Sequence, residues 1–355
     1  MPGKGELPDK LFENICVPLI AVVFSFLIGA AFVLFVGQNP LFVYARLIEG
    51  TLGSTYGLGQ VLFKATPLIF TGLSVAFAFR VGLFNIGCEG QLAMGAFATA
   101  WAGVTLKSLP GPVLIPISIL FGMAFGAFWA FVPGILKARL GTHEVINTIM
   151  MNFIASAILS YLVTSVYGVP ETLHTEPIAL AARIPRLESL WPAFKGSPVN
   201  VSFFLALVFC VAVYLYLWHT KFGYSMRATG LSPLAAEYSG VNVRRYLVTG
   251  MTLSGALSGL VGVNYVMGYK YYYESEFSGG VGFMAIPVAL LGRNHPLGVV
   301  LSAMLFGILS HGGLVINTLV PKEFVEILQA VVIVSILITS NIFRDWVVSL
   351  RKRKL

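Results

Sequence analysis

Long apolar runs recur along the whole chain, and each is close to the length that a helix needs to cross a lipid bilayer, about 20 residues. Helices satisfy their own backbone hydrogen bonds in hydrocarbon, so the pattern predicts an all-α fold. The candidate crossings are residues 14–37, 61–80, 92–107, 112–133, 145–167, 199–218, 247–267, 297–314 and 325–343. Two other apolar stretches, 81–91 and 279–292, are too short or too glycine-rich to be ordinary spans. With 279–292 as a short or broken crossing, residues 1–355 form one polytopic membrane domain of about ten transmembrane helices.

The composition supports a membrane protein and argues against other classes. Of the 355 residues, 57% are hydrophobic and 11% are charged, too few charges to solvate the surface of a water-soluble protein. The net charge of +8 comes from short basic clusters between apolar runs, which excludes a nucleic-acid-binding stripe. Cys16, Cys88 and Cys210 form no C-x-x-C pair, so neither a metal site nor a disulfide is predicted.

The distribution of basic residues predicts that both termini are cytoplasmic. With the N-terminus inside, most of the 23 lysines and arginines fall on the cytoplasmic side, including the tail Arg351, Lys352, Arg353 and Lys354. The opposite orientation would carry that tail across the membrane, against the positive-inside rule. The same orientation makes residues 168–198 a long external loop and residues 219–246 a cytoplasmic loop.

The cytoplasmic loop 219–246 carries the signals of a short, separate helix. Ser232 suits the N-cap and Pro233 the first helical position, where a missing N–H costs nothing. Gly240 supplies a left-handed stop. A loop that only connects two spans does not need caps at both ends, whereas a helix that presses on a partner does. The alternative is a helix that lies on the lipid headgroups.

Residues 81–91 place Asn85, Glu89 and Gln91 among glycines in a hydrophobic region. Non-helical backbone at membrane depth is tolerated where it is buried in protein or lines a watery cavity, and broken helices often mark transport pathways. Glu89 is either in contact with substrate or accepts backbone N–H bonds at the start of the next helix.

Residues 141–152 carry a second group of polar side chains. Asn147 and Asn152 within a span either pair across helices or line a pathway. His143-Glu144 does not continue into H-E-x-x-H, because Asn147 stands where the second histidine would be, so a zinc protease is excluded. The chain also lacks a P-loop and a nucleophile elbow, so it is predicted not to be an enzyme and to hold no cofactor of its own.

Three segments resemble a known family: Gly82–Gln91 (GLFNIGCEGQ), Glu144–Asn152 (EVINTIMMN) and Gly230–Val243 (GLSPLAAEYSGVNV). They are similar to the bacterial ABC-importer permeases for nucleosides and simple sugars, which are related to ribose and branched-chain amino acid permeases. Ala289–Gly298 (ALLGRNHPLG) is similar to the late glycine-rich motif of that family. The likeness extends from about residue 40 to 340, and Cys88 stands where a small aliphatic residue is commoner.

This resemblance implies a type II ABC-importer permease in the bacterial inner membrane. Its expected partners are a cytoplasmic ABC ATPase that uses the ATP, a second and different permease chain, an external substrate-binding lipoprotein and the lipid bilayer. The capped segment would dock on the ATPase, through Arg227, Ser232, Pro233, Ala236, Glu237 and Gly240. Nucleosides are the expected substrates, with a simple sugar or a branched-chain amino acid as the alternative.

A nucleoside site needs aromatic stacking and amide hydrogen bonds, although a sugar would be served by the same groups. The residues expected to line the pathway are Phe84, Asn85, Glu89, Gln91, Asn147, Asn152 and Asn264, with Trp101 as a further aromatic candidate. The main rival function is a secondary transporter, which would need ionisable residues inside the membrane. Apart from Glu89 the sequence offers hardly any.

Overall fold

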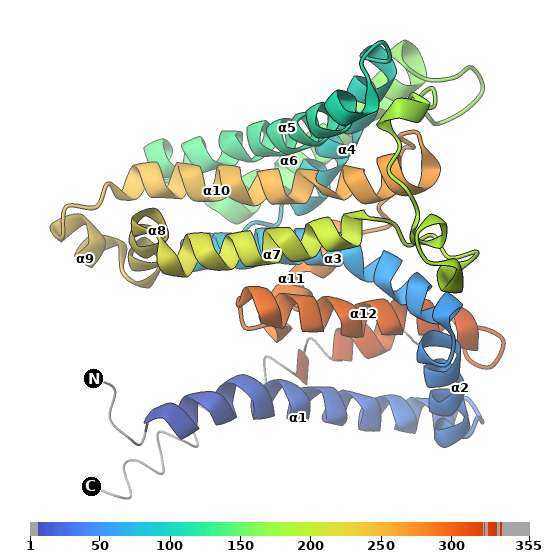
Figure 1. Cartoon of the computed structure of the whole chain (residues 1–355). Coiled ribbons are helices and arrows are strands. Elements are labelled where there is room, and N and C mark those ends of the chain that lie inside the picture. Colours follow the sequence, from blue (N-terminus) through green and yellow to red (C-terminus); the bar gives the residue numbers. More distant parts are fainter. Residues whose placement is uncertain (1–5, 322, 324–325, 332–333, 336–355) are drawn as a thin grey trace, which may run out of the picture.

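The computed structural model describes residues 6–321, 323, 326–331 and 334–335, and these residues are almost entirely helical (Figure 1). The longer helices are α1 (Glu6–Phe35), α3 (Thr55–Arg80), α4 (Cys88–Thr105), α5 (Gly111–Leu140), α6 (Glu144–Tyr161), α7 (Ser202–His219), α10 (Val243–Gly259) and α12 (Pro296–Ile316). The shorter α-helices are α2 (Pro40–Leu52), α8 (Lys221–Leu231), α9 (Pro233–Tyr238) and α11 (Val281–Leu291). Two π-helical segments, η1 (Leu162–Val166) and η5 (Val263–Lys270), follow α6 and α10. Within the described residues there is no β-sheet, only isolated bridges.

Six helices in the described part of the chain are long and apolar enough to cross a membrane, and a bent pair would make seven. The six are α3, α5, α6 with η1, α7, α10 with η5, and α12. Their number and apolar character agree with the predicted polytopic membrane protein. The predicted crossing 92–107 is α4, which is not among the six, and 279–292 contains α11, an apolar helix of 11 residues. Residues 325–343 lie mostly outside the described residues.

The bent pair contains a helix that the sequence did not predict. Residues 22–35 of α1 and α2 meet at 116°. The turn ends with Asn39, whose side chain accepts a hydrogen bond from the amide of Leu41 at 2.9 Å, and Pro40 follows at the first helical position. These are ordinary N-terminal helix signals, and the predicted span 14–37 ended just before them.

Glycines bring α4, α5 and α10 into backbone contact at the centre of the bundle. A Cβ atom on Gly95 would lie 2.4 Å from the Cα of Gly259, and one on Gly126 would lie 2.4 Å from the carbonyl of Gly255. Such close approaches need residues without side chains. The sequence has small residues four apart at Gly95/Thr99, Gly122/Gly126 and Gly255/Gly259, and these residues pack against one another across the three helices, whereas Gly103 faces Ile178 of the long loop.

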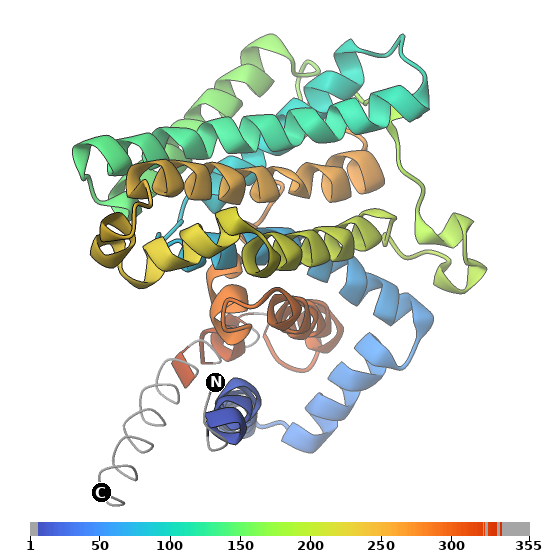
Figure 2. The ribbon, with the colours of Figure 1, turned by 60° about the vertical axis from the view of Figure 1, so that its left-hand side comes forward.

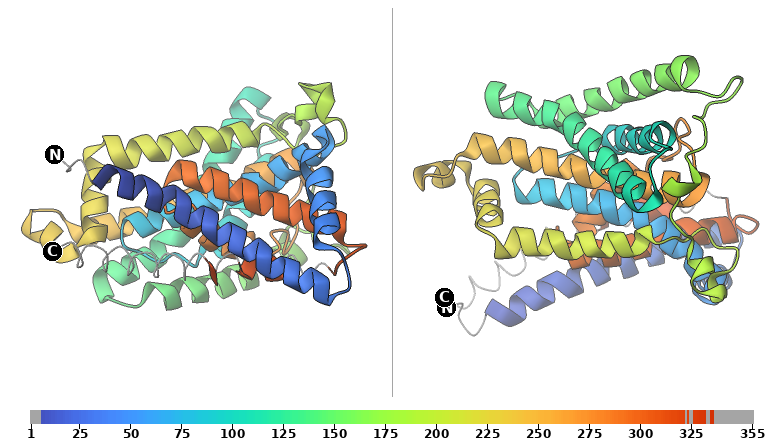
Figure 3. Two further views of the ribbon diagram at one scale, coloured as in Figure 1. Left: turned by 90° about the horizontal axis from the view of Figure 1, so that it is seen from below. Right: turned by 45° about the horizontal axis from the view of Figure 1, so that its top comes forward.

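The long loop and the α8–α9 pair lie at opposite ends of the bundle (Figures 1, 2 and 3). The loop includes the short 3₁₀ turns η2 (Leu180–Ala182), η3 (Leu187–Ser189) and η4 (Pro192–Phe194). The first turns of α1 lie at the same end as α8 and α9 (Figures 1 and 3).

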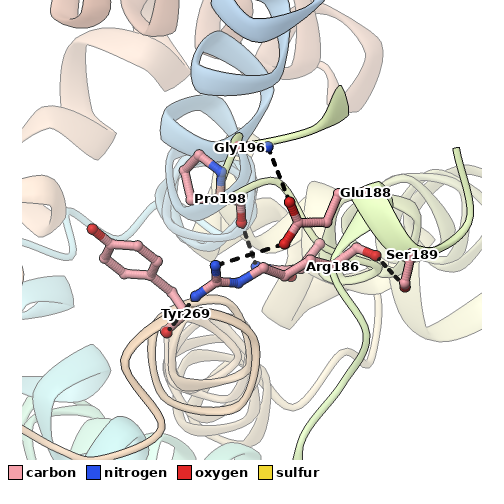
Figure 4. Close-up of polar contacts among 7 residues, drawn as sticks. Arg186, Glu188, Ser189, Gly196, Pro198 and Tyr269 are labelled. Atoms are coloured by element: carbon pink, nitrogen blue, oxygen red, sulfur yellow. Dashed lines mark hydrogen bonds and ion pairs between the residues drawn. The ribbon is translucent and has the colours of Figure 1, made fainter. Parts of the chain in front are cut away.

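Polar contacts tie the long loop to the end of η5 (Figure 4). Arg186 Nη2 donates to the carbonyl oxygen of Tyr269 at 3.1 Å, and Arg186 Nη1 lies 3.9 Å from Glu188 Oε1. Glu188 in turn accepts a hydrogen bond from the amide of Gly196 at 3.0 Å. The loop is thus a folded cover over this end of the bundle.

Candidate functional site

The N-termini of α4 and α11 meet inside the bundle at the carboxylate of Glu89. Glu89 Oε2 accepts a hydrogen bond from the amide of Gly282 at 2.7 Å, and Oε1 accepts one from the hydroxyl of Ser278. Eleven residues of α-helix are about 16 Å long, roughly half of the hydrocarbon core, so α11 is a half-helix. Its first N–H groups have no partner within the helix, and an anion stabilises that positive end.

Of the two roles expected for Glu89, the hydrogen-bonding role describes its contacts, but the helix that it caps is not the next one in the chain. The capped helix is α11, whose Gly282 is 193 residues away in sequence. A half-helix with a charged contact at its buried end is the kind of element that lines transport pathways.

The backbone before α4 is held by a buried polar network around Asn85. Its Oδ1 accepts from the amide of Gly87 at 3.0 Å, and its Nδ2 donates to Gln91 Oε1 at 2.9 Å and to Ser254 Oγ at 2.8 Å. Gly82 enters the segment at φ +80°, a conformation that glycine adopts without strain. Asn85 and Gln91 thus satisfy each other in the interior and fix residues 82–87 as a non-helical link.

Asn152 joins α6 to the same junction. Its side chain accepts a hydrogen bond from the amide of Gly90 at 2.9 Å and donates one to the carbonyl of Ile86 at 3.0 Å. Asn152 belongs to a row of polar side chains at every fourth position of α6 and η1, and the full row is Glu144, Thr148, Asn152, Ser156, Ser160 and Thr164. Ser156, Ser160 and Thr164 are exposed, so three hydroxyl side chains lie on the open surface of a membrane helix, beside the exposed ring of Phe153.

Two cavities flank the irregular segment that precedes α11. The first, here the α6 cavity, has a volume of about 320 Å³, and its lining includes Glu89, Asn152, Ser156, Ser160, Tyr273 and Ser278. The second, here the α12 cavity, has a volume of about 800 Å³, and its lining includes Lys64, Tyr265, Phe277, Ser278, Phe283 and Ser310. Phe277 and Ser278 line both, so the segment that Glu89 holds is also the wall between the two cavities.

Several other residues that the sequence predicted to line the pathway lie elsewhere. Phe84 stacks on Phe79 with ring centroids 5.2 Å apart, and Trp101 lies beside another hollow near the long loop. Asn147 Nδ2 donates to Thr142 Oγ1 at 2.5 Å near the start of α6. Asn264 is buried, and its Oδ1 accepts from the side chains of Asn200 and Ser202 at 3.0 Å each. The structure therefore brings Glu89 and Asn152 together at one cavity and places the other predicted residues apart from it.

Sequence reasoning did not find Ser156, Ser160, Tyr273 and Ser278. The signal for the two α6 serines was present in the four-residue spacing of polar residues, which continues beyond Asn152. Tyr273 and Ser278 lie in an irregular segment, and only its fold places them near Glu89. Among the described residues, no group of three or more His, Cys, Asp or Glu side chains could hold a metal ion.

At the other end of the molecule, α9 has the caps expected from the sequence. Ser232 Oγ accepts from the amide of Ala235 at 3.3 Å, Pro233 occupies the first turn, and Gly240 follows the helix at φ +84°. The side chain of Ala236 is buried and that of Glu237 is exposed.

The outer surface of this capped pair is strongly apolar. Leu231 is 88% exposed, Leu234 70% and Tyr238 93%. Three large apolar side chains so close together on a protruding loop mark an interaction surface. Arg227 does not share this surface, because its guanidinium lies over the ring of Trp218, 5.6 Å from the centroid.

Comparison with known proteins finds one matching family and several close relatives. The model of the family described as "branched-chain amino acid transport system / permease component" matches residues 57–337. The nucleoside ABC transporter permease NupB of Lactococcus lactis subsp. cremoris (strain MG1363) is 37% identical over 327 residues, 90% of each chain. The guanosine ABC transporter permease NupP of Bacillus subtilis (strain 168) is 38% identical over 332 residues, 91% of this chain and 93% of the relative.

A third relative is named for another substrate. The glucose ABC transporter permease TsgB13 of Haloferax volcanii is 34% identical over 337 residues, 93% of this chain and 88% of the relative. The first two organisms each have a second matching permease, NupC and NupQ, 28% identical to this chain. No solved structure matches the chain significantly.

Proposed function

The chain belongs to the branched-chain amino acid transport system permease family, and we propose that it forms the membrane pathway of an ATP-driven importer for nucleosides. It is an ABC permease subunit and not itself an enzyme, so ATP hydrolysis takes place in a partner ATPase. The observation that carries the proposal is the α8–α9 pair, a capped and exposed apolar unit at the opposite end of the bundle from the long loop.

The ATPase docks on the face formed by Leu231, Leu234 and Tyr238. Exposure of these apolar side chains to water is unfavourable, so binding of a partner that covers them is stabilised by their burial. This assignment makes the α8–α9 end cytoplasmic, in agreement with the arginines and lysines of that side. Ten crossings with both termini inside the cell then follow if α1, α4, α11 and residues 325–343 each count as one span.

A second permease chain completes the pathway. NupB and NupC, like NupP and NupQ, are pairs of permeases in one organism, and a heterodimer is the corresponding arrangement here. The exposed hydroxyls of Ser156, Ser160 and Thr164 line the water-filled pathway between the two chains, because hydroxyl groups are poor partners for lipid. An external lipoprotein delivers the substrate to the long loop, and the complex resides in the bacterial inner membrane.

Nucleosides are the substrate class that two of the relatives, NupB and NupP, support. The α6 cavity combines a tyrosine ring with hydroxyl, amide and carboxylate groups, a chemistry that suits a base attached to a sugar. The alternative is a simple sugar, favoured by the relative that carries glucose in its name, with a branched-chain amino acid next. Secondary transport is disfavoured because Glu89 is engaged by Ser278 and Gly282 and is not a free ion-coupling group.

The test is uptake in a strain that lacks the chain and in the same strain complemented with it. Radiolabelled guanosine should enter the complemented strain only, and unlabelled nucleosides but not glucose should compete. Depletion of cellular ATP with the ion gradients maintained should stop uptake. Guanosine uptake that is the same in both strains would reject the substrate, and uptake that persists without ATP would reject the ABC mechanism.

A further inference from the structure

The end of α11 opposite Glu89 is held by an arginine from another helix. Arg80, the last residue of α3, donates through Nε to the carbonyl of Asn294 at 2.9 Å and through Nη2 to the carbonyl of Arg293 at 3.1 Å. Arg293 and Asn294 both have left-handed backbone, at φ 52° and 53°. The turn thus aims carbonyl groups at the guanidinium, whose planar fork can bind two acceptors at once.

The Arg80 guanidinium also contacts Trp218, close to the point where α7 connects to α8. It lies 5.1 Å from the ring centroid of Trp218 near the end of α7, and Arg227 of α8 lies 5.6 Å from that ring. His295, the residue after the left-handed turn, lies 5.2 Å from the same ring. The ring of Trp218 therefore lies between side chains from the end of α3, from α8 and from the residue that follows the turn after α11.

The backbones of α8 and of the end of α3 are in direct contact. A Cβ atom on Gly230 would lie 2.4 Å from the carbonyl oxygen of Arg80, and one on Gly82 would lie 3.1 Å from the Cα of Gly230. Packed backbones transmit displacement because the interior resists compression. A movement of α8 must therefore move Arg80 and the link that leads to α4.

Two polar atoms at this junction have no hydrogen-bond partner among the described residues. They are Nε of Arg227 and Oδ1 of Asn294, and both are buried. Buried polar groups are normally satisfied, and an exception calls for a reason. The N–H donor of Arg227 and the acceptor oxygen of Asn294 can therefore form hydrogen bonds in another conformation, in which α8 and the end of α11 have moved relative to each other.

We propose that Arg80 is a positioning residue that couples α8 to α11, so that displacement of the ATPase-docking helices reaches the Glu89 junction from both sides. One route runs from Gly230 to the 82–87 link and α4. The other runs through Trp218 and Arg80 to the C-terminal end of α11, and the two routes converge where Glu89 binds Ser278 and Gly282. This inference rests on the proposed function, since it requires a partner ATPase that moves α8.

The experiment uses the whole transporter, reconstituted in proteoliposomes with its ATPase and binding protein, and measures guanosine uptake and ATP hydrolysis on the same sample. The variants are Arg80→Gln, which removes the fork and the charge, and Arg80→Lys, which keeps the charge without the fork. Arg139→Gln is the matched control, because Arg139 is an exposed arginine near the same end of the bundle. The chain must first show ATP-driven uptake in the wild type; if it does not, the proposed function fails.

In the Arg80→Gln variant, uptake per ATP hydrolysed should fall about tenfold while the ATPase still copurifies, a loss within the usual range of coupling between two sites. Arg80→Lys should retain an intermediate ratio and Arg139→Gln the wild-type ratio. A wild-type ratio in Arg80→Lys and Arg80→Gln would overturn the proposal. Loss of the assembled complex in Arg80→Lys would also overturn it, by assigning Arg80 a folding role.

Discussion

Glu89 at the start of α4 accepts a hydrogen bond from the amide of Gly282 at the start of α11, so one carboxylate joins the N-termini of two helices that are 193 residues apart in sequence. Both helix ends carry partial positive charge, and the carboxylate between them offsets both. The contact holds the wall between the α6 and α12 cavities in place. A transporter needs such a wall to be stable in one state and movable in another.

Replacing Glu89 by Gln should loosen this junction. The amide keeps the shape of the carboxylate but loses its charge, and hydrogen bonds to a charged group contribute about 2 kcal/mol. The midpoint of thermal unfolding of the solubilised complex should fall, and guanosine uptake should fall with it. Glu276→Gln is the matched control, because Glu276 lines the same cavity and is exposed. Equal effects of the two substitutions would argue against a specific role for Glu89.

Replacing Asn85 by Ala should destabilise the fold more than it affects substrate selection. The substitution leaves the side chain of Gln91 and the amide of Gly87 without their buried partner, and each unsatisfied group costs about 1–3 kcal/mol. Ser254 keeps its hydrogen bonds to Ser74. Thermal unfolding should therefore shift strongly, whereas the relative uptake of guanosine and competing nucleosides should stay constant. Asn147→Ala, at a half-buried position with a local bond to Thr142, should shift unfolding less. A change of substrate preference in Asn85→Ala would instead place this residue in the pathway.

Adding one methyl group at Gly259 should disturb the centre of the bundle. The Cβ of an alanine would lie 2.1 Å from the carbonyl oxygen of Gly122, so α5 and α10 must separate, at a cost of about 1–3 kcal/mol. Folding yield and unfolding temperature should both fall in Gly259→Ala. Leu253→Ala, on the same helix at a position 36% exposed, is the comparison and should be milder. An unchanged unfolding temperature in Gly259→Ala would show that the helices do not pack this closely.

Replacing Leu234 by Ser should weaken the ATPase contact without affecting the fold. The side chain is 70% exposed on α9, so its loss removes little internal packing. Covering an apolar side chain in an interface contributes about 1–2 kcal/mol, so the affinity for the ATPase should fall about tenfold. Binding of the purified ATPase to the permease in nanodiscs measures this directly. Leu180→Ser, 78% exposed at the opposite end, should leave the affinity unchanged; an effect there and not at Leu234 would reverse the assigned orientation.

The parts of the molecule that depend on neighbouring residues could be predicted from the sequence. Ser232, Pro233 and Gly240 specify α9 through local backbone chemistry. Acceptance of backbone hydrogen bonds was one of the two roles expected for Glu89, at the start of the next helix. The partner of Glu89 was not expected, because nothing near residue 89 reports that Gly282 folds against it.

Contacts between distant segments were the main omission. Arg80 is the last residue of a long helix and, read alone, is only a positive charge near the cytoplasm. Its binding of the turn at Arg293 and Asn294 needs the tertiary fold to be seen. The same holds for Asn264, which seemed suited to a pathway and instead bonds Asn200 and Ser202 beneath the long loop.

The most direct test of the central claim is site-specific cross-linking from α9. Two variants each carry a single cysteine, in a chain whose natural cysteines are replaced by serine or alanine. One has it at Tyr238, which is 93% exposed on α9, and the other at Leu180 in the long loop. A short bifunctional reagent should join Tyr238→Cys to an ATPase subunit, and the yield should change when ATP binds. Leu180→Cys should be labelled from outside intact cells and should never join the ATPase. Labelling of Tyr238→Cys from outside the cell, or the absence of any ATPase adduct in active complexes, would contradict the account.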